Sequence, residues 1–377
     1  MRIVVAPDSY KGSVSALQVA EAMARGIRRI FPHSEVVRVP VADGGEGTVE
    51  AMICAAGGQL RHTEVTAPLG DRVLAHWGVL GDGRTAVIEM AAASGLTLVP
   101  RDRLDPRIST SFGTGELIRA ALDAGLRRII LGIGGSATND GGVGMAQALG
   151  VSFLDSKGTP LAAGGAALAG LAQIDLGKLD SRLGETELIV ACDVDNPLSG
   201  PRGASAVFGP QKGASATVVQ ELDAALSHFA QIARQATGRD VALAAGAGAA
   251  GGLGAGLLFF TPAQLRPGVE IVLEAANFAE RLQGARFVLT GEGRTDFQTA
   301  CGKAPVGVAR HAKAAGLPVF CLSGGIGQGA DEVLQHGIDA VLSICDRPMT
   351  LEESMRDGEA LIEAATARLC RILTAAG

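Results

Sequence analysis

Five loops in this sequence combine glycines with carboxylates and small hydroxyl residues, and each follows a run of apolar, β-prone residues. The loops occupy residues 8–12, 43–48, 134–142, 193–197 and 291–296. In an open parallel sheet, ligands bind beyond the carboxyl ends of strands, where the following helices begin. Glycine lets the backbone approach a ligand, helix amino ends attract anions, and carboxylates hold Mg²⁺. The loops therefore predict a site for an anionic substrate together with a nucleotide and a metal ion.

The fourth loop contains a pair of carboxylates, Asp193 and Asp195, separated by one residue. In extended backbone geometry residues i and i+2 point to the same side, so these carboxylates can hold one Mg²⁺. The alternative is that Asp195 caps a turn into Asn196 and Pro197, which aspartate and asparagine favour. We favour the metal or catalytic interpretation, because the four other acidic loops follow strands in the same way.

Lys212, Arg294 and Lys303 are cations that are flanked by glycines. A solvated surface charge is the ordinary interpretation of a single lysine or arginine. In a chain with a net charge of -6, however, a phosphate must be attracted by local groups rather than by a general basic field. A cation framed by glycines is therefore a candidate for phosphate contact. The neighbouring carboxylates, such as Asp8 beside Lys11, are interpreted equally well as site residues or as ion-pair and capping residues.

Two nucleotide-binding motifs can be weighed directly. Residues 246–251 read GxGxxG, but a dinucleotide fingerprint also needs a preceding strand and an acidic residue at the end of the next strand. Here Glu270 and Glu274 fall in a helix-like stretch, so a flexible or close-approach loop is the better interpretation. The sequence GxxxxGK[ST] is absent, because the glycine and lysine at 302–303 precede alanine. A standard nucleoside-triphosphate loop is excluded.

The composition narrows the class of protein. Of the 377 residues, 47% are hydrophobic and 19% are charged, as in a folded chain, and the length favours two domains. Aromatic residues make up only 3%, which argues against stacking platforms for single-stranded nucleic acid. The sequence shows neither an export signal pattern nor an apolar run long enough to span a membrane. We therefore expect a cytoplasmic protein with small-molecule partners, and neither nucleic acid nor membrane as a partner.

Strand and helix signals alternate at both ends of the chain. After the first loop, Ser15 begins a capping box and an amphipathic helix that stops near Pro32. The further strands are expected at 35–41, 286–290, 317–322 and 339–344, and the further helices at about 47–56, 304–315, 330–336 and 351–373. Because two βα units do not make a stable sheet alone, both ends are expected to build one doubly wound parallel sheet.

The middle of the chain reads differently and predicts a second domain. It opens with a hairpin pattern, 73–80 and 85–90, around a Gly-Asp-Gly turn, before more α/β units follow. The predicted organisation is an α/β protein in which residues 1–70 and 285–377 form one discontinuous domain. Residues 71–284 are expected to form the inserted second α/β domain.

The chain resembles the bacterial glycerate kinases of the first type. The motifs that carry the resemblance run in order along essentially the whole chain: APDSYKGSVSA, PVADGGEGT, IEMAAASGL, TSFGTGELI, IGGSATNDGGVGMAQALG, ACDVDNPLSGPRGASAVFGPQKGA, AGAGAAGGLGAG and GEGRTDFQTACGKAPVGVA. A mild departure is Tyr10, where the family commonly has phenylalanine. The resemblance implies ATP-dependent phosphorylation of D-glycerate, at the 2-hydroxyl to give 2-phosphoglycerate. It also implies a flavodoxin-like domain formed by both chain ends, with an inserted second domain.

Phosphoryl transfer is mostly positioning and charge neutralisation, and on that physical ground we assign roles to the loop residues. Asp193 and Asp195 take the metal or base roles, which the sequence does not separate, and Lys11, Arg294 and Lys303 contact the glycerate carboxylate and the transferring phosphate. The predicted glycerate pocket is lined by Asp8, Ser9, Asp43, Glu46, Glu292 and Asp296. The predicted nucleotide-binding residues are Gly134, Gly135, Ser136, Thr138, Asn139, Asp140 and Lys212.

The cofactors expected from these roles are ATP and Mg²⁺. Alternatives left open by the residues are a kinase of a related small hydroxy acid, a kinase that forms 3-phosphoglycerate, and, remotely, a non-catalytic sensor of a sugar acid. The sensor is disfavoured because the carboxylate pair is present and no basic helix pair for DNA is evident.

Overall fold

The computed structural model describes residues 1–300 and 302–375, and the chain divides into two compact units. Unit 1 contains both ends of the chain, Met1–Asp43 and Pro267–Gly377, together with Glu50–Gly57. Unit 2 contains Gly58–Arg266 together with the short segment Gly44–Val49. The main chain therefore passes between the units at 43/44, 49/50, 57/58 and 266/267, whereas the sequence places the domain boundaries near 70 and 285.

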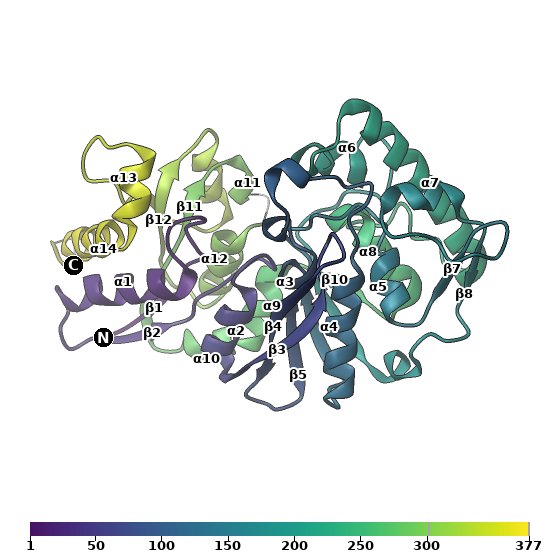
Figure 1. Ribbon diagram of the computed structural model, residues 1–377. Coiled ribbons are helices and arrows are strands. Elements are labelled where there is room, and N and C mark those ends of the chain that lie inside the picture. Colours follow the sequence, from purple (N-terminus) through teal and green to yellow (C-terminus); the bar gives the residue numbers. More distant parts are fainter. Residues whose placement is uncertain (301, 376–377) are drawn as a thin grey trace. The chain divides into compact units, whose positions relative to one another are not determined.

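The central sheet of unit 1 is parallel throughout and is built by both chain ends, as predicted (Figure 1). The strand order is β13-β12-β11-β1-β2, which is the flavodoxin-like order of a doubly wound sheet. The bounds are β1 Arg2–Val5, β2 Glu35–Arg38, β11 Ala285–Thr295, β12 Val319–Ile326 and β13 Ala340–Ser343. The prediction of one sheet from both ends is confirmed. The strand order reverses between β1 and β11, and a ligand site is expected at this topological switch point.

Helix α1, Ala16–Arg28, begins with the predicted capping box, because the Ser15 side chain accepts from the Gln18 backbone N–H and the Gln18 side chain bonds back. It packs alongside α14, Gly358–Ala375, so closely that a Cβ on Gly26 would lie 2.5 Å from the Glu363 carbonyl oxygen. Arg25 adds ion pairs to Glu359 and Glu363. The helix pair covers one side of the sheet through apolar residues that alternate along the strands, such as Ile3 and Val5 in β1.

The other helices of unit 1 include α12, which packs against β11, β12 and α9. Their bounds are α2 Thr48–Ala56, α9 Gly268–Ala275, α10 Phe278–Arg281, α11 Phe297–Ala300, α12 Ala304–Ala314, the 3₁₀ segment Ala330–His336 and α13 Leu351–Arg356. The expected helix at 330–336 is thus a 3₁₀ segment. The expected single helix at 351–373 is two helices, α13 and α14. They meet at Gly358, where a Cβ would lie 2.7 Å from Val14 Cγ2 and 2.8 Å from Ser13 Oγ.

Unit 2 contains a six-stranded mixed sheet with the order β10-β9-β6-β5-β4-β3. Its strands are β3 Gly58–Thr66, β4 Arg72–Leu80, β5 Thr85–Glu89, β6 Arg128–Gly132, β9 Glu187–Ala191 and β10 Gln264–Arg266, and a separate small ladder joins β7 Ser152–Leu154 to β8 Gln173–Asp175. The predicted hairpin is confirmed by the antiparallel pairing of β4 with β5. Strand β3 had no sequence signal, because it is an edge strand whose side chains are mostly exposed and need not be apolar.

The helices of unit 2 pack on this sheet around one large apolar core. They are α3 Ala91–Ser94, α4 Phe112–Asp123, α5 Val143–Ala148, α6 Ala204–Phe208, α7 Ala216–Thr237 and α8 Ala249–Phe260, with 3₁₀ segments at Leu96–Leu98, Arg101–Arg103, Gly165–Gly170, Ser181–Glu185 and Pro210–Lys212. Among the residues that the structure describes, no helix combines the length and apolar character needed to cross a membrane.

Candidate functional site

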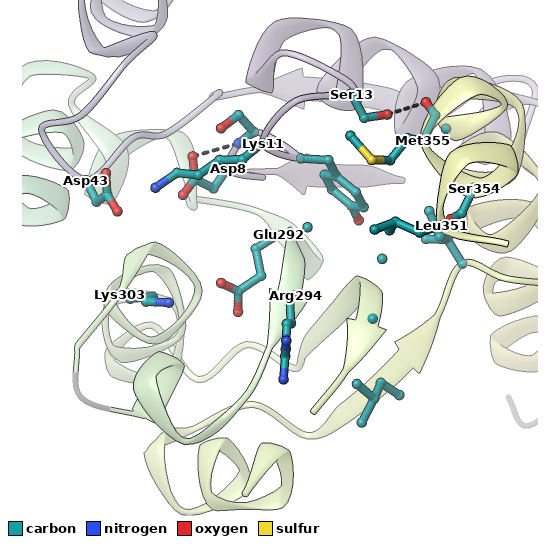
Figure 2. Close-up of a pocket in the computed structure, with 18 residues that line it drawn as sticks. Asp8, Lys11, Ser13, Asp43, Glu292, Arg294, Lys303, Leu351, Ser354 and Met355 are labelled. Atoms are coloured by element: carbon teal, nitrogen blue, oxygen red, sulfur yellow. Dashed lines mark hydrogen bonds between the residues drawn. The ribbon is translucent and has the colours of Figure 1, made fainter. Parts of the chain in front are cut away.

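A cavity of about 590 Å³ opens in unit 1 at the carboxyl ends of β1, β11 and β12, next to the switch point of the sheet (Figure 2). This is where the order of the strands predicts a ligand site. The lining residues are Asp8, Ser9, Tyr10, Lys11, Ser13, Asp43, Glu292, Gly293, Arg294, Lys303, Gly324, Gly325, Ile326, Ile344, Leu351, Ser354, Met355 and Gly358. Seven of the predicted site residues are therefore brought together: Asp8, Ser9, Lys11, Asp43, Glu292, Arg294 and Lys303.

Asp8 follows β1 and is the most strongly perturbed carboxyl group of the cavity. Its Oδ1 accepts a hydrogen bond from the backbone N–H of Ser9 at 2.6 Å. Burial, with a further contribution from the nearby Asp43 carboxylate, raises the pKa of Asp8 to about 7. A carboxylate with such a pKa can take up and release a proton near neutral pH.

Glu292 lies within β11, which continues to Thr295, and its side chain is fixed by two hydroxyl groups. Its Oε1 accepts hydrogen bonds from Thr299 Oγ1 at 2.7 Å and from Thr295 Oγ1 at 3.1 Å. Burial raises the pKa of Glu292, while the Thr299 hydrogen bond and the charge of Lys303 oppose that rise. The result is a buried, oriented carboxyl group that faces the same cavity as Asp8.

Three cations line the cavity: Lys11, Arg294 and Lys303. Lys11 is exposed, and the Arg294 side chain is 70% exposed, with its Nε 3.4 Å from Asp296 Oδ2. Lys303 is the N-cap residue of α12, and its Nζ lies 3.4 Å from Gln298 Oε1. These contacts of Arg294 and Lys303 are both 3.4 Å long, and the two groups and the exposed Lys11 are accessible to an anionic ligand. Asp296, predicted as a pocket residue, instead pairs with Arg294.

The opposite end of the cavity is apolar, and sequence reasoning missed it. In Figure 2, Asp8, Glu292 and Lys303 lie toward one side of the cavity, while Leu351 and Met355 lie toward the other. The further residues that line the cavity are Tyr10, Gly324, Gly325, Ile326, Ile344, Ser354 and Gly358. Leucine and isoleucine carry no chemical signal in a sequence, so only the meeting of β12 with α13 reveals this wall.

In unit 2, the glycine-rich loop after β6 surrounds a buried lysine. Lys212, which ends the 3₁₀ segment Pro210–Lys212, is only 1% exposed. Its Nζ donates to Ser136 Oγ at 2.7 Å and to the Thr138 carbonyl oxygen at 2.6 Å. Burial lowers the pKa of Lys212 to about 7. The ammonium group therefore bonds to the loop itself, which fixes the conformation of the loop.

Asp140 is equally buried and is a hydrogen-bond hub of this loop. Its carboxylate accepts from the Ser111 backbone N–H and hydroxyl, both at 2.8 Å, and from the backbone N–H groups of Gly142 at 3.1 Å and Gly144 at 3.2 Å. Burial nevertheless raises the pKa of Asp140. Asn139 donates to Ser205 Oγ at 2.9 Å. The polar side chains of this predicted nucleotide loop thus mostly bond within unit 2, while the loop backbone at Gly134 and Gly135 is partly or fully exposed.

The GxGxxG run at 246–251 packs against the same loop. A Cβ on Gly251 would lie 1.9 Å from the Thr138 carbonyl oxygen, and the Gly251 carbonyl accepts from the Gly141 N–H at 3.0 Å. Gly251 also has φ of +68°, which favours glycine. These glycines allow close approach of two backbone segments, which agrees with the close-approach interpretation and not with a dinucleotide fingerprint.

Asp193 and Asp195 lie in an irregular, exposed loop directly after β9. Asp195 Oδ1 accepts from Arg202 at 2.8 Å, the Asp195 side chain is 74% exposed, and Asp193 is also exposed. Among the described residues, no group of three or more His, Cys, Asp or Glu side chains is arranged to hold a metal ion. Mg²⁺ commonly binds through one or two carboxylates plus phosphates and water, so an exposed carboxylate pair fits that mode. Glu46, also in unit 2, is exposed near Glu89.

Comparison with known proteins agrees with the family resemblance of the motifs. The model of the glycerate kinase family matches residues 3–374. Glycerate kinase of Bacillus subtilis (strain 168) is 54% identical over 363 residues, covering 96% of this chain and 95% of that protein. Glycerate 2-kinase of Escherichia coli (strain K12) is 54% identical over 356 residues, covering 94% of this chain and 93% of that protein.

A solved structure described as glycerate kinase 2 from Salmonella typhimurium LT2 matches with a TM-score of 0.88 and 50% identity, covering 100% of this chain and 99% of that chain. The family match spans nearly the full sequence, and the similarity extends to both chain ends and to the inserted unit. On this evidence, the chain belongs to the glycerate kinase family.

Proposed function

We propose that this protein transfers the γ-phosphoryl group of ATP to the 2-hydroxyl of D-glycerate, giving 2-phosphoglycerate and ADP. The observation that carries the proposal is the charged end of the unit 1 cavity, where three cations and three carboxyl groups converge. Family membership supports the reaction, and the relative from Escherichia coli is named a glycerate 2-kinase. Such a cavity provides cations for a small carboxylate and a proton acceptor for its hydroxyl group.

The cations are proposed to neutralise the negative charge of the reactants. Glycerate carries one carboxylate, and the transferring phosphoryl group carries charge on its equatorial oxygens. Lys11, Arg294 and Lys303 are accessible in the cavity and provide the positive charge that these groups need. Arg294 can contact two carboxylate oxygens at once through its planar guanidinium group.

Asp8 is proposed as the group that accepts the proton of the 2-hydroxyl. As the hydroxyl oxygen forms its bond to phosphorus and the bond to the ADP oxygen breaks, the proton moves to the Asp8 carboxylate and later leaves to water. A pKa of about 7 suits that exchange, because the group is largely ionised at slightly alkaline pH yet basic enough to take up a proton. Glu292, held by Thr295 and Thr299, is proposed to orient the substrate hydroxyl groups.

In unit 2, the loop backbone rather than its buried side chains is proposed to contact the nucleotide phosphates. Gly135 is exposed and has φ of +77°, so its N–H group can approach an anion, whereas the Gly134 N–H donates to the Gly44 carbonyl at 3.3 Å. Lys212, Asn139 and Asp140 are then positioning residues that hold this loop. Mg²⁺ would be held by Asp193 and Asp195, and it would neutralise phosphate charge when bound.

Replacing Lys11 by methionine is expected to raise KM for glycerate by about tenfold, which corresponds to about 1.4 kcal/mol, because one cation facing the carboxylate is lost. Lys11 is exposed, so folding is expected to be unaffected. Steady-state kinetics with each substrate varied in turn measure this. If KM for ATP rises and KM for glycerate does not, Lys11 contacts the nucleotide instead.

Replacing Asp195 by asparagine is expected to lower kcat by about 10²-fold, because the amide removes a negative charge that would hold Mg²⁺. The side chain is 74% exposed, so the variant should fold normally. The activity is measured over a range of Mg²⁺ concentrations, with Asp240→Asn, another exposed aspartate of unit 2, as control. A kcat near that of the unmodified protein would indicate that Asp195 caps a turn and does not hold Mg²⁺.

The substrate is tested by a panel of small hydroxy acids. ADP formation is measured with D-glycerate, L-glycerate, tartronate and a longer aldonate, each with Mg-ATP. We expect kcat/KM to be highest for D-glycerate. A higher value for another acid would assign the enzyme to that acid, and binding of D-glycerate without any ADP formation would support a sensor.

A further inference from the structure

We propose that the apolar end of the unit 1 cavity is the binding site for the adenine ring of the nucleotide. The inference rests on the proposed kinase function, to which it adds the place and the residues that recognise the base. The residues that carry it come from the end of β12, from the segment after β13 and from α13: Ile326, Ile344, Leu351, Ser354 and Met355.

The size of the cavity is the first observation. At about 590 Å³, it falls in the range of about 300–1,000 Å³ that holds drug-sized ligands. Glycerate is a three-carbon acid, and the charged end with Asp8, Lys11 and Glu292 already provides what its functional groups need. The same cavity extends to the apolar end, so it has room for a larger ligand with an apolar part.

The chemistry of the walls is the second observation. Ile326 is 54% exposed and Leu351 is 75% exposed, although both are large aliphatic residues. They come from different elements, β12 and α13, yet line the same cavity together with Met355. Exposed aliphatic surface gains about 25 cal/mol per Å² when a ligand covers it. A flat, apolar ring is the part of ATP that such walls accommodate.

The third observation is that the end of strand β12, which lines the cavity, extends beyond its pairing with β13. Strand β12 pairs with β13 only as far as Ser323 opposite Ser343, but β12 continues to Ile326. A Cβ placed on Gly325 would meet no heavy atom within 4 Å, so there is open space on the Cβ side of this residue. The Gly325 carbonyl accepts from Ser323 Oγ at 2.6 Å and keeps a second lone pair, so this carbonyl and the Ser354 hydroxyl complement donors and acceptors at the edge of adenine.

The predicted nucleotide loop of unit 2 offers no comparable surface for a base. The side chains of Ser136, Thr138, Asn139, Asp140 and Lys212 are at most 7% exposed. Backbone groups of such a loop can contact phosphate, but they do not provide an apolar wall. The apolar wall of unit 1 is therefore the better match for the adenine ring.

The test uses the full-length protein with two variants, Leu351→Glu and Gly325→Val. The first places a charge against the ring, and the second fills the space beside the β12 backbone. Both are expected to raise KM for ATP and Kd for ADP at least tenfold, while KM for glycerate changes less than twofold. Leu334→Glu, which replaces an exposed leucine of unit 1 that does not line the cavity, is the matched control. Thermal unfolding of all variants checks that they fold.

Inorganic tripolyphosphate separates the base from the phosphates. Because it lacks adenine, its inhibition constant is expected to be the same in Leu351→Glu as in the unmodified protein. Equal weakening of tripolyphosphate and ADP would overturn the proposal, as would unchanged ADP binding in both variants or a wild-type protein that binds no ADP. If ADP binding weakens as expected but the unmodified protein phosphorylates no glycerate, the adenine site stands and the proposed function fails.

Discussion

Replacing Asp8 by asparagine is expected to lower kcat for glycerate phosphorylation by about 10²-fold or more, because the amide cannot accept the proton of the substrate hydroxyl. The kcat of the unmodified protein should rise with pH through about 7, since the pKa of Asp8 is raised to about 7 and only the ionised form is a base. Both the kcat of Asp8→Asn and the pH dependence of kcat in the unmodified protein are measured by the rate of 2-phosphoglycerate formation, from about pH 5.5 to about pH 9.

The same variant should be more heat-stable at alkaline pH. Below the ordinary pKa of 3.8, Asp8 is protonated in the folded and unfolded states, so the substitution changes little. Above the folded-state pKa of about 7, the folded protein must carry a charge that burial and Asp43 disfavour. Asp8→Asn is therefore expected to raise Tm at pH ~8 by about 2–4 °C or more, and the gain should vanish near pH ~4.

Asp331→Asn is the matched control for Asp8, because Asp331 is an exposed aspartate of the same unit. It should change neither kcat nor Tm at either pH. If Asp8→Asn keeps more than half of the normal kcat, the proton goes elsewhere. A Tm gain that is equal at both pH values would contradict the raised pKa.

Replacing Asp140 by alanine is expected to have the largest effect on stability, about 3–5 kcal/mol of the free energy of unfolding. The substitution removes the acceptor for the buried N–H groups of Ser111, Gly142 and Gly144, and each unsatisfied group costs about 1–3 kcal/mol. Burying the Asp140 carboxylate itself costs free energy, as its raised pKa shows, and alanine removes that cost. The expected loss is therefore smaller than the sum of the three unsatisfied N–H groups. Urea unfolding monitored by circular dichroism measures it.

The control for Asp140 is Asp155→Ala. Asp155 also accepts backbone hydrogen bonds, from Lys157 at 2.8 Å and Thr159 at 2.9 Å, but in an exposed turn where water replaces the lost acceptor. Its expected loss is about 1 kcal/mol or less. If Asp140→Ala proves as stable as Asp155→Ala and instead raises KM for ATP, Asp140 acts on the nucleotide and not on the loop.

The sequence predicted the sheet that positions the site. Runs such as residues 2–5 and 285–290 are apolar and β-prone, and Asp8 and Glu292 follow them, although the expected loop from residue 291 is a continuation of β11 to Thr295. Because the carboxyl ends of parallel strands lie at one edge of a sheet, placing both runs in one sheet also placed these carboxyl groups near each other. The same rule places Lys11, which lies in the segment after β1, but not Lys303, which follows α11 and is the N-cap residue of α12.

Burial and apolar walls are what the sequence could not reveal. Lys212, Asn139 and Asp140 belong to residue types that are usually exposed, and their burial depends on the glycines around 251 that let a second backbone segment approach within contact distance. Leu351 is an apolar residue that is exposed, and the sequence alone does not distinguish an exposed leucine from a leucine of the core. Both features depend on long-range packing, which local spacing does not encode.

The reaction itself is tested most directly by ³¹P NMR of the product. Purified protein is incubated with D-glycerate and Mg-ATP, and the phosphoester signal is compared with authentic 2-phosphoglycerate and 3-phosphoglycerate. We predict a signal from 2-phosphoglycerate that grows as ATP is converted to ADP. A 3-phosphoglycerate signal would reverse the orientation proposed for glycerate beside Asp8, and the absence of any phosphoester would contradict the kinase function.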